Sequence, residues 1–182
     1  MRHSSNRVVV GIVVAIAGVV MLATMGRAVA FLAAALLVAY AFWLKSPPIE
    51  PRRVLPAYAF AVAAQILHLI EENRSEFYRE FPPVLGAAPW GHTAWLVFNV
   101  TWLLVFALAG LGLVSRWQPA GVVALFLALG TGVLNGLGHF ALALNVGGYF
   151  PGLLTAPLVF GAGCHLAFQV LRRRSNIEVP AI

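Results

Sequence analysis

The stretch "ILHLIEENRSE" (66–76) places ionisable side chains at the end of an apolar segment. His68, Glu71 and Glu72 are spaced i, i+3 and i+4, so a helix brings them onto one face, with Gln65 about one turn before them. An imidazole beside two carboxylates suits metal ligation or a proton relay. The alternative is that the helix ends here and that both glutamates are the first solvated residues of a loop.

A second polar group lies in "TGVLNGLGH" (131–139), where Thr131, Asn135 and His139 follow at i, i+4 and i+8. This spacing predicts one stripe on a helix. The glycines around the stripe let neighbouring helices approach closely. Polar groups in hydrocarbon need partners, so Thr131 and Asn135 could also serve only as interhelical hydrogen bonds.

The composition indicates a membrane protein. Of 182 residues, 61% are hydrophobic and 10% are charged, whereas a soluble domain is about half apolar and about a quarter charged. The same numbers exclude an intrinsically disordered chain. The single cysteine, Cys164, excludes an intramolecular disulfide and a cysteine-based zinc site, and we expect it to be a small buried hydrophobe.

The net charge of +6 does not indicate nucleic-acid binding. The basic residues flank apolar segments, and no basic stripe with interleaved aromatic residues is present in the sequence. Their positions are typical of membrane topology and of contacts with lipid headgroups. We therefore expect a membrane lipid or an apolar small molecule as the partner, and no nucleic acid.

The apolar segments predict the fold class. A helix needs about 20 apolar residues to cross the hydrocarbon core. We predict one all-α domain over residues 1–182, a polytopic membrane helical bundle with about six transmembrane helices at 8–25, 28–44, 55–70, 94–114, 120–146 and 153–171. The third begins near Pro56, because proline is tolerated in a first helical turn.

The first connection, Gly26-Arg27, is very short. Two alternatives to a helical hairpin therefore exist for the N-terminal segment. One is a single kinked or re-entrant segment. The other is a signal peptide cleaved at "AVA" (28–30), although its apolar region is longer than usual for that class.

The distribution of lysine and arginine predicts that both termini face the inside. Three basic residues fall in the outer segments of that topology, namely Arg27, Arg74 and Arg79, against nine in the inner segments, namely Arg2, Arg7, Lys45, Arg52, Arg53, Arg116 and Arg172–Arg174. The expected location is the cytoplasmic (inner) membrane of a bacterium. We expect the aromatic outer loop 73–93 to form an amphipathic helix at the interface.

In this topology the third and fifth spans both run from the inside to the outside. His68 and His139 then lie at similar depth in the outer half of the bilayer, so we expect the two polar groups to form one site. Asn99 lies in the outer part of the fourth span. His165, in the sixth span, could supply a third histidine if that helix leans inward, or could be a neutral histidine with a local partner.

Three short patterns follow one another in the chain: H-x-x-E-E, N-x-x-x-H and Y-x-P-G-x-x-T. They are formed by the listed residues His68, Glu71, Glu72, Asn135, His139, Tyr149, Pro151, Gly152 and Thr155. Together they resemble the HXXEE family of integral membrane proteins over about residues 55–171. The resemblance implies a site built from these residues and does not name a reaction.

Our leading hypothesis is a metal-dependent membrane enzyme, either a hydrolase or an oxidoreductase. His68, His139 and Glu72 or Glu71 would bind a divalent metal, zinc or iron, and leave positions open for water and substrate. The other glutamate would act as a general base, or both would bridge two metals. Asn135 would form a hydrogen bond with one of the metal-binding side chains and so orient it.

Three other functions fit the same residues. A metal-free isomerase or cyclase could use a glutamate and a histidine for acid–base chemistry. A proton-coupled transporter or binding protein would also place ionisable groups in the membrane. Finally, the polar residues could only hold helices together. The sequence makes no prediction of the metal's identity, the substrate or the oligomeric state.

Overall fold

The computed structural model describes residues 2–172, and in this range it contains helices and turns and no strand. The elements are α1 (Arg2–Met25), the 3-10 turn η1 (Gly26–Val29), α2 (Ala30–Lys45), α3 (Pro51–Arg74), α4 (Phe77–Val84), α5 (His92–Val114), α6 (Ala120–Phe126), the π-helical η2 (Leu127–Leu134), α7 (Asn135–Val146) and α8 (Ala156–Leu171). The predicted all-α class is confirmed. Arg173 and Arg174, which entered the charge count, lie outside the described residues.

The helices form a membrane bundle. Four apolar helical stretches are long enough to cross a bilayer: Asn6–Lys45, Pro51–Arg74, His92–Val114 and Ala120–Val146. The first of them contains α1 from Asn6 onward, η1 and α2, and α8 adds a shorter apolar helix. Large apolar side chains such as Leu104, Leu108 and Leu111 are exposed on the outside of the bundle, as expected for a surface that faces lipid. The number of crossings and the orientation stay predictions.

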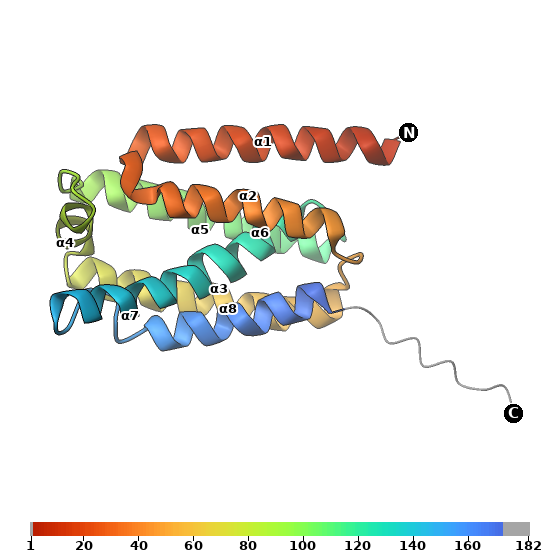
Figure 1. Ribbon diagram of the computed structural model, residues 1–182. Helices are drawn as coiled ribbons and strands as arrows, with labels where there is room; N and C mark the ends of the chain where they lie inside the picture. Colours follow the sequence, from red (N-terminus) through yellow and green to blue (C-terminus); the bar gives the residue numbers. More distant parts are fainter. Residues whose placement is uncertain (1, 173–182) are drawn as a thin grey trace, which may run out of the picture.

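The N-terminal segment is a helical hairpin. α1 and α2 pack side by side and run in opposite directions (Figure 1). η1 reverses the chain between them, and Gly26 has a φ of +70°, which glycine adopts without strain. In the structure this hairpin replaces the alternative of a single kinked segment. The alternative of a signal peptide cleaved after residue 30 is not tested by the fold.

The third and sixth predicted spans and the helices that correspond to them begin at different residues. α3 begins at Pro51, not at residue 55, because Glu50 is extended and Pro51 occupies the first turn. Pro56 therefore lies inside the helix. α8 begins at Ala156, not at residue 153, because residues 151–155 form a turn.

The rod made of α6, η2 and α7 lies at the centre of the bundle. Of its apolar window 67% is buried, against 22% for that of α5. It packs most closely on α8, where a Cβ added to Gly132 would lie 2.7 Å from the Cα of Gly163. Only hydrogen at both positions permits this approach. The prediction that glycines bring helices close to this rod is thus confirmed.

α4 lies across one end of the bundle, and α1 begins at the other end (Figure 1). The outer loop does contain a helix, as predicted. However, Phe77, Tyr78 and Phe81 are buried against the bundle, so this helix does not turn these aromatic rings to the membrane interface. Phe77 and Phe81 stack with ring centroids 4.8 Å apart. This end of the bundle therefore carries an aromatic cover above α3 and α7.

Candidate metal site under α4

His68 and Glu72 lie on the buried face of the last turns of α3, and His139 faces them from α7. Their exposed fractions are 0%, 4% and 1%. α3 continues past Glu72 to Arg74, so Glu72 is not a solvated residue after a helix end. The alternative that both glutamates simply begin a loop is therefore wrong for Glu72.

Three donor atoms form a small triangle. His68 Nε2 lies 3.3 Å from Glu72 Oε1, His139 Nε2 lies 3.2 Å from the same oxygen, and the two Nε2 atoms are 3.1 Å apart. A divalent ion with bonds of about 2.0–2.2 Å keeps neighbouring donors roughly 3–3.5 Å apart. Hence these three buried side chains could hold a metal ion.

The opposite side of the His68 ring is held by a hydroxyl. His68 Nδ1 lies 2.7 Å from Thr155 Oγ1, and the Thr155 hydroxyl donates to Glu71 Oε2 over 2.5 Å. The Thr155 oxygen must then accept the proton of Nδ1. This assigns the Nδ1–H tautomer to His68 and leaves the Nε2 lone pair facing the triangle, as in histidines that bind metals. Asn135 Nδ2 donates to that lone pair over 2.9 Å.

Glu71 turns away from the triangle. Its carboxylate accepts the backbone N–H of Leu154 (3.0 Å) and of Thr155 (2.7 Å), and the hydroxyl of Tyr149 (2.9 Å). Burial raises the pKa of the Tyr149 phenol, so it remains a donor at neutral pH. Glu71 was predicted as a ligand or base next to Glu72. In the structure the Glu71 carboxylate instead accepts hydrogen bonds at the turn before α8. A carboxylate at this end of the helix also complements the helix dipole.

The turn before α8 also fixes the ring of His139. Gly152 has a φ of +90°, and a Cβ there would lie 2.6 Å from His139 Nδ1. Any side chain at this position would therefore collide with the imidazole. His139 Nδ1 is buried and has no hydrogen-bond partner among the described residues. The glycine of the third motif thus acts by leaving space for the histidine of the second.

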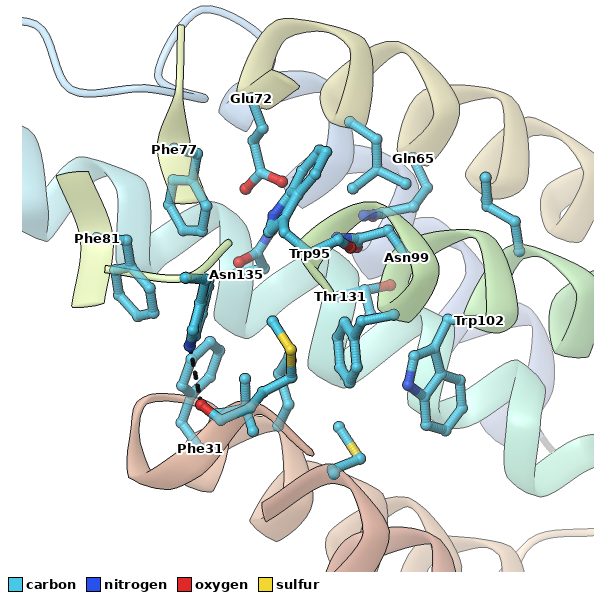
Figure 2. A pocket seen from close by; sticks show the side chains of 18 of the residues that line it. Phe31, Gln65, Glu72, Phe77, Phe81, Trp95, Asn99, Trp102, Thr131 and Asn135 are labelled. Atoms are coloured by element: carbon cyan, nitrogen blue, oxygen red, sulfur yellow. Dashed lines mark hydrogen bonds between the residues drawn. The ribbon is translucent and has the colours of Figure 1, made fainter. Parts of the chain in front are cut away.

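A pocket of about 60 Å³ has Glu72 and Asn135 among its lining residues. Figure 2 shows the Glu72 carboxylate directed into it from above. Most of its wall is aromatic or aliphatic, with lining residues that include Met21, Met25, Phe31, Phe77, Phe81, Trp95, Trp102, Phe106 and Phe126.

The remaining predicted residues divide between the pocket and the lipid surface. Gln65, Asn99 and Thr131 line the pocket. His165 is exposed on α8, so the expectation that it joins the site was wrong: α8 packs on η2 through the face that carries Gly163. Its neighbour Cys164 is also exposed and is not the predicted buried hydrophobe.

Sequence reasoning missed the aromatic wall of the pocket and the contribution of the N-terminal hairpin. Trp95 and Trp102 lie on α5, where the sequence shows an apolar span without any sign of which rings face inward. Met21 and Met25 come from the end of α1. No spacing pattern connects these helices, so only the fold brings them to one cavity.

A family model described as "protein of unknown function with HXXEE motif" matches residues 59–167. The chain belongs to the HXXEE family. No curated protein and no solved structure matches the chain. The matched residues include all three residues of the donor triangle and the turn before α8, whereas α1 and α2 precede the matched range.

Proposed function

We propose that this HXXEE protein is a metal-dependent membrane enzyme that acts on a lipid or another apolar molecule. His68, Glu72 and His139 would hold one divalent ion, zinc or iron. The observation that carries the proposal is the donor triangle, with sides of 3.1–3.3 Å and the Nε2 lone pair of His68 facing inward. Two imidazoles and one carboxylate are the donor set of many catalytic zinc and non-haem iron sites.

Glu72 belongs both to the donor triangle and to the lining of the pocket. The three donors would therefore leave coordination positions for water and substrate on the side of the pocket. An ion there supplies Lewis acidity or activates water, which suits hydrolysis, and an iron ion suits oxidation. Asn135 now donates to the lone pair that the ion would take. With an ion bound by His68, the Asn135 N–H would be available to hydrogen-bond to a substrate.

The apolar wall supports an apolar substrate. Phe77 and Phe81 of α4 cover the site from the end of the bundle, and Trp95 closes it from α5. A mainly apolar surrounding of this kind strengthens electrostatic interactions at the reacting end. A substrate dissolved in the bilayer would leave one apolar environment for another on binding.

The test is the metal content of protein purified in detergent, measured by mass spectrometry. We expect near-stoichiometric zinc or iron in the natural protein and almost none in His68→Ala or in His139→Ala. His165→Ala is the matched control, because this histidine is exposed on α8, and it should keep the metal. Circular dichroism verifies that all variants remain helical. Absence of metal after reconstitution with both ions would rule out the proposal.

A second candidate is acid–base chemistry without a metal, as in an isomerase or cyclase. It is favoured by the direct contact of Glu72 Oε1 with both imidazoles, which could pass a proton between carboxylate and ring. Activity that survives strong chelators and disappears in Glu72→Gln would support this candidate over the metal enzyme.

A further inference from the structure

His165 is an imidazole on the outer surface of the bundle. Its side chain is exposed on α8, and within residues 2–172 it forms no hydrogen bond, ion pair or aromatic contact. α8 packs on η2, α3 and α7, and Figure 1 shows it along the edge of the bundle opposite α1. The imidazole therefore points away from the protein, towards lipid.

The position of His165 along α8 is far from both ends of the helix. At each end α8 is fixed against α3, which is long enough to cross a bilayer: Thr155 Oγ1 lies 2.7 Å from His68 Nδ1, and Arg53 donates to the carbonyl of Arg172 over 3.1 Å. His165 follows Thr155 by ten residues and precedes Arg172 by seven, which is about 15 Å and about 10 Å along the axis. Its short side chain cannot reach an interface, as lysine and arginine can. An unpaired polar group in hydrocarbon is unfavourable, so His165 needs a partner.

Five exposed residues form one stripe along α8: Pro157, Gly161, Cys164, His165 and Phe168. We call this stripe the α8 face. At about 100° per residue, Cys164, His165 and Phe168 lie within about 60° of Gly161 around the helix axis. A Cβ added to Gly161 would meet no atom within 4 Å, so packing inside the protomer does not require glycine there. The missing side chain leaves a notch in the α8 face, through which another helix can approach closely.

We propose that the α8 face binds the α8 face of a second copy of the chain, so that the protein forms a dimer in the membrane. Both copies have the same orientation in the bilayer, so the two-fold axis is parallel to the membrane normal. Each residue near this axis then lies opposite its own copy. The notch at Gly161 brings the two helices together, with His165 beside the contact.

The chemistry of His165 is the reason that a second copy fits this face. A neutral imidazole has one donor and one acceptor nitrogen. Two copies of His165 are therefore complementary, because the N–H of one ring can donate to the free nitrogen of the other. Lipid acyl chains offer no such group and would leave the ring unpaired. The donor triangle contains no residue of the α8 face, so the dimer does not depend on a bound metal.

The first experiment uses Cys164, the single cysteine of the chain, as a natural probe of the interface. The full chain in membranes is oxidised with copper–phenanthroline, and disulfide-linked dimers are measured on non-reducing gels. We expect dimers of the natural protein, and also of Gly161→Cys in a Cys164→Ser background. The matched control is Leu108→Cys in that background, because Leu108 is 66% exposed on α5, outside the α8 face. It should form few dimers.

The second experiment measures association of labelled copies by energy transfer in lipid vesicles, over a range of protein-to-lipid ratios. We expect His165→Leu to weaken the dimer about three- to tenfold, since the interhelical hydrogen bond is lost. His165→Gln keeps one donor and one acceptor and should restore most of the association. Gly161→Leu fills the notch and should give monomers, although a side chain there meets no atom of its own protomer.

Three results would overturn the proposal. One is equal cross-linking at Leu108→Cys and at Cys164, which indicates random collision. Another is a natural protein that stays monomeric in vesicles or that cross-links only to a different protein. The third is association that Gly161→Leu retains in full, and this variant decides the matter even if His165→Leu does not fold. Metal content, measured on the same samples, should not change, so the dimer and the proposed enzyme fail separately.

Discussion

At the scale of single residues, the hydroxyl of Thr155 connects the Glu71 carboxylate to the His68 ring. Replacing it with valine keeps the shape and removes both hydrogen bonds. We expect Thr155→Val to lower metal affinity about 10–100-fold, because the partner that orients a metal-binding histidine is lost. Titration with a competing zinc chelator measures this. Thr101→Val, which removes an exposed hydroxyl from α5, is the control and should change nothing.

Substitution of the two adjacent glutamates should affect different properties of the protein. Glu72→Gln is expected to abolish metal binding with little loss of stability, since a neutral amide is a poor ligand in this triangle. Glu71→Gln should lower the free energy of unfolding by about 1–3 kcal/mol, because it weakens the charge-assisted hydrogen bonds at the start of α8. Metal content and thermal unfolding in detergent, measured on both variants, separate the two roles. Identical behaviour would contradict this division.

The sequence predicted which residues meet but not what each one does. The i, i+4 spacing of His68 and Glu72 and the shared depth of His139 were enough to predict that they converge. Whether Glu71 or Glu72 enters the triangle depends on the rotation of α3 relative to α7 and α8, and neighbouring glutamates look alike in the chain. The position of His165 could not be predicted for a similar reason. An apolar helix face can pack against lipid or against the protein interior, so the sequence of α8 does not show which way His165 points.

At the scale of elements, the contact between η2 and α8 depends on two glycines. A Cβ on Gly163 would lie 2.9 Å from the Cα of Gly132, so Gly163→Ala must push the helices apart. We expect a loss of stability of about 1–3 kcal/mol. Gly161→Ala, on the same helix with no atom within 4 Å, should be neutral or slightly stabilising. Thermal unfolding in detergent compares the two, and equal effects would contradict the close packing.

Hydropathy predicted the extent of the fourth and fifth spans closely, but it did not predict which helices are neighbours. The predicted fifth span, 120–146, coincides with α6 to α7, and the fourth, 94–114, differs from α5 only at its start. The π-helical η2 inside the fifth rod was not predicted, because its extra residue per turn leaves no mark on an apolar pattern. The burial of Phe77 and Phe81 was missed since an amphipathic helix can cover a bundle end as well as a membrane surface.

At the scale of the whole molecule, the predicted orientation has a direct test. In a Cys164→Ser background, we expect Glu80→Cys to react with a membrane-impermeant maleimide in intact cells, and Arg52→Cys to react only after the membrane is opened. Both positions are exposed, and they lie near opposite ends of α3. The reason is the excess of basic residues on the Arg52 side. The reverse labelling would invert the topology and put the donor triangle in the inner half.

The pocket is lined by two parts of the chain, only one of which lies within the family match. The wall with the donor atoms belongs to the part that defines the family, and the wall with Met21, Met25 and Phe31 comes from the hairpin that precedes it. Methionine side chains adapt readily to ligands of different shape. Substitutions in the hairpin can thus reshape one wall of the pocket without changing any residue of the donor triangle.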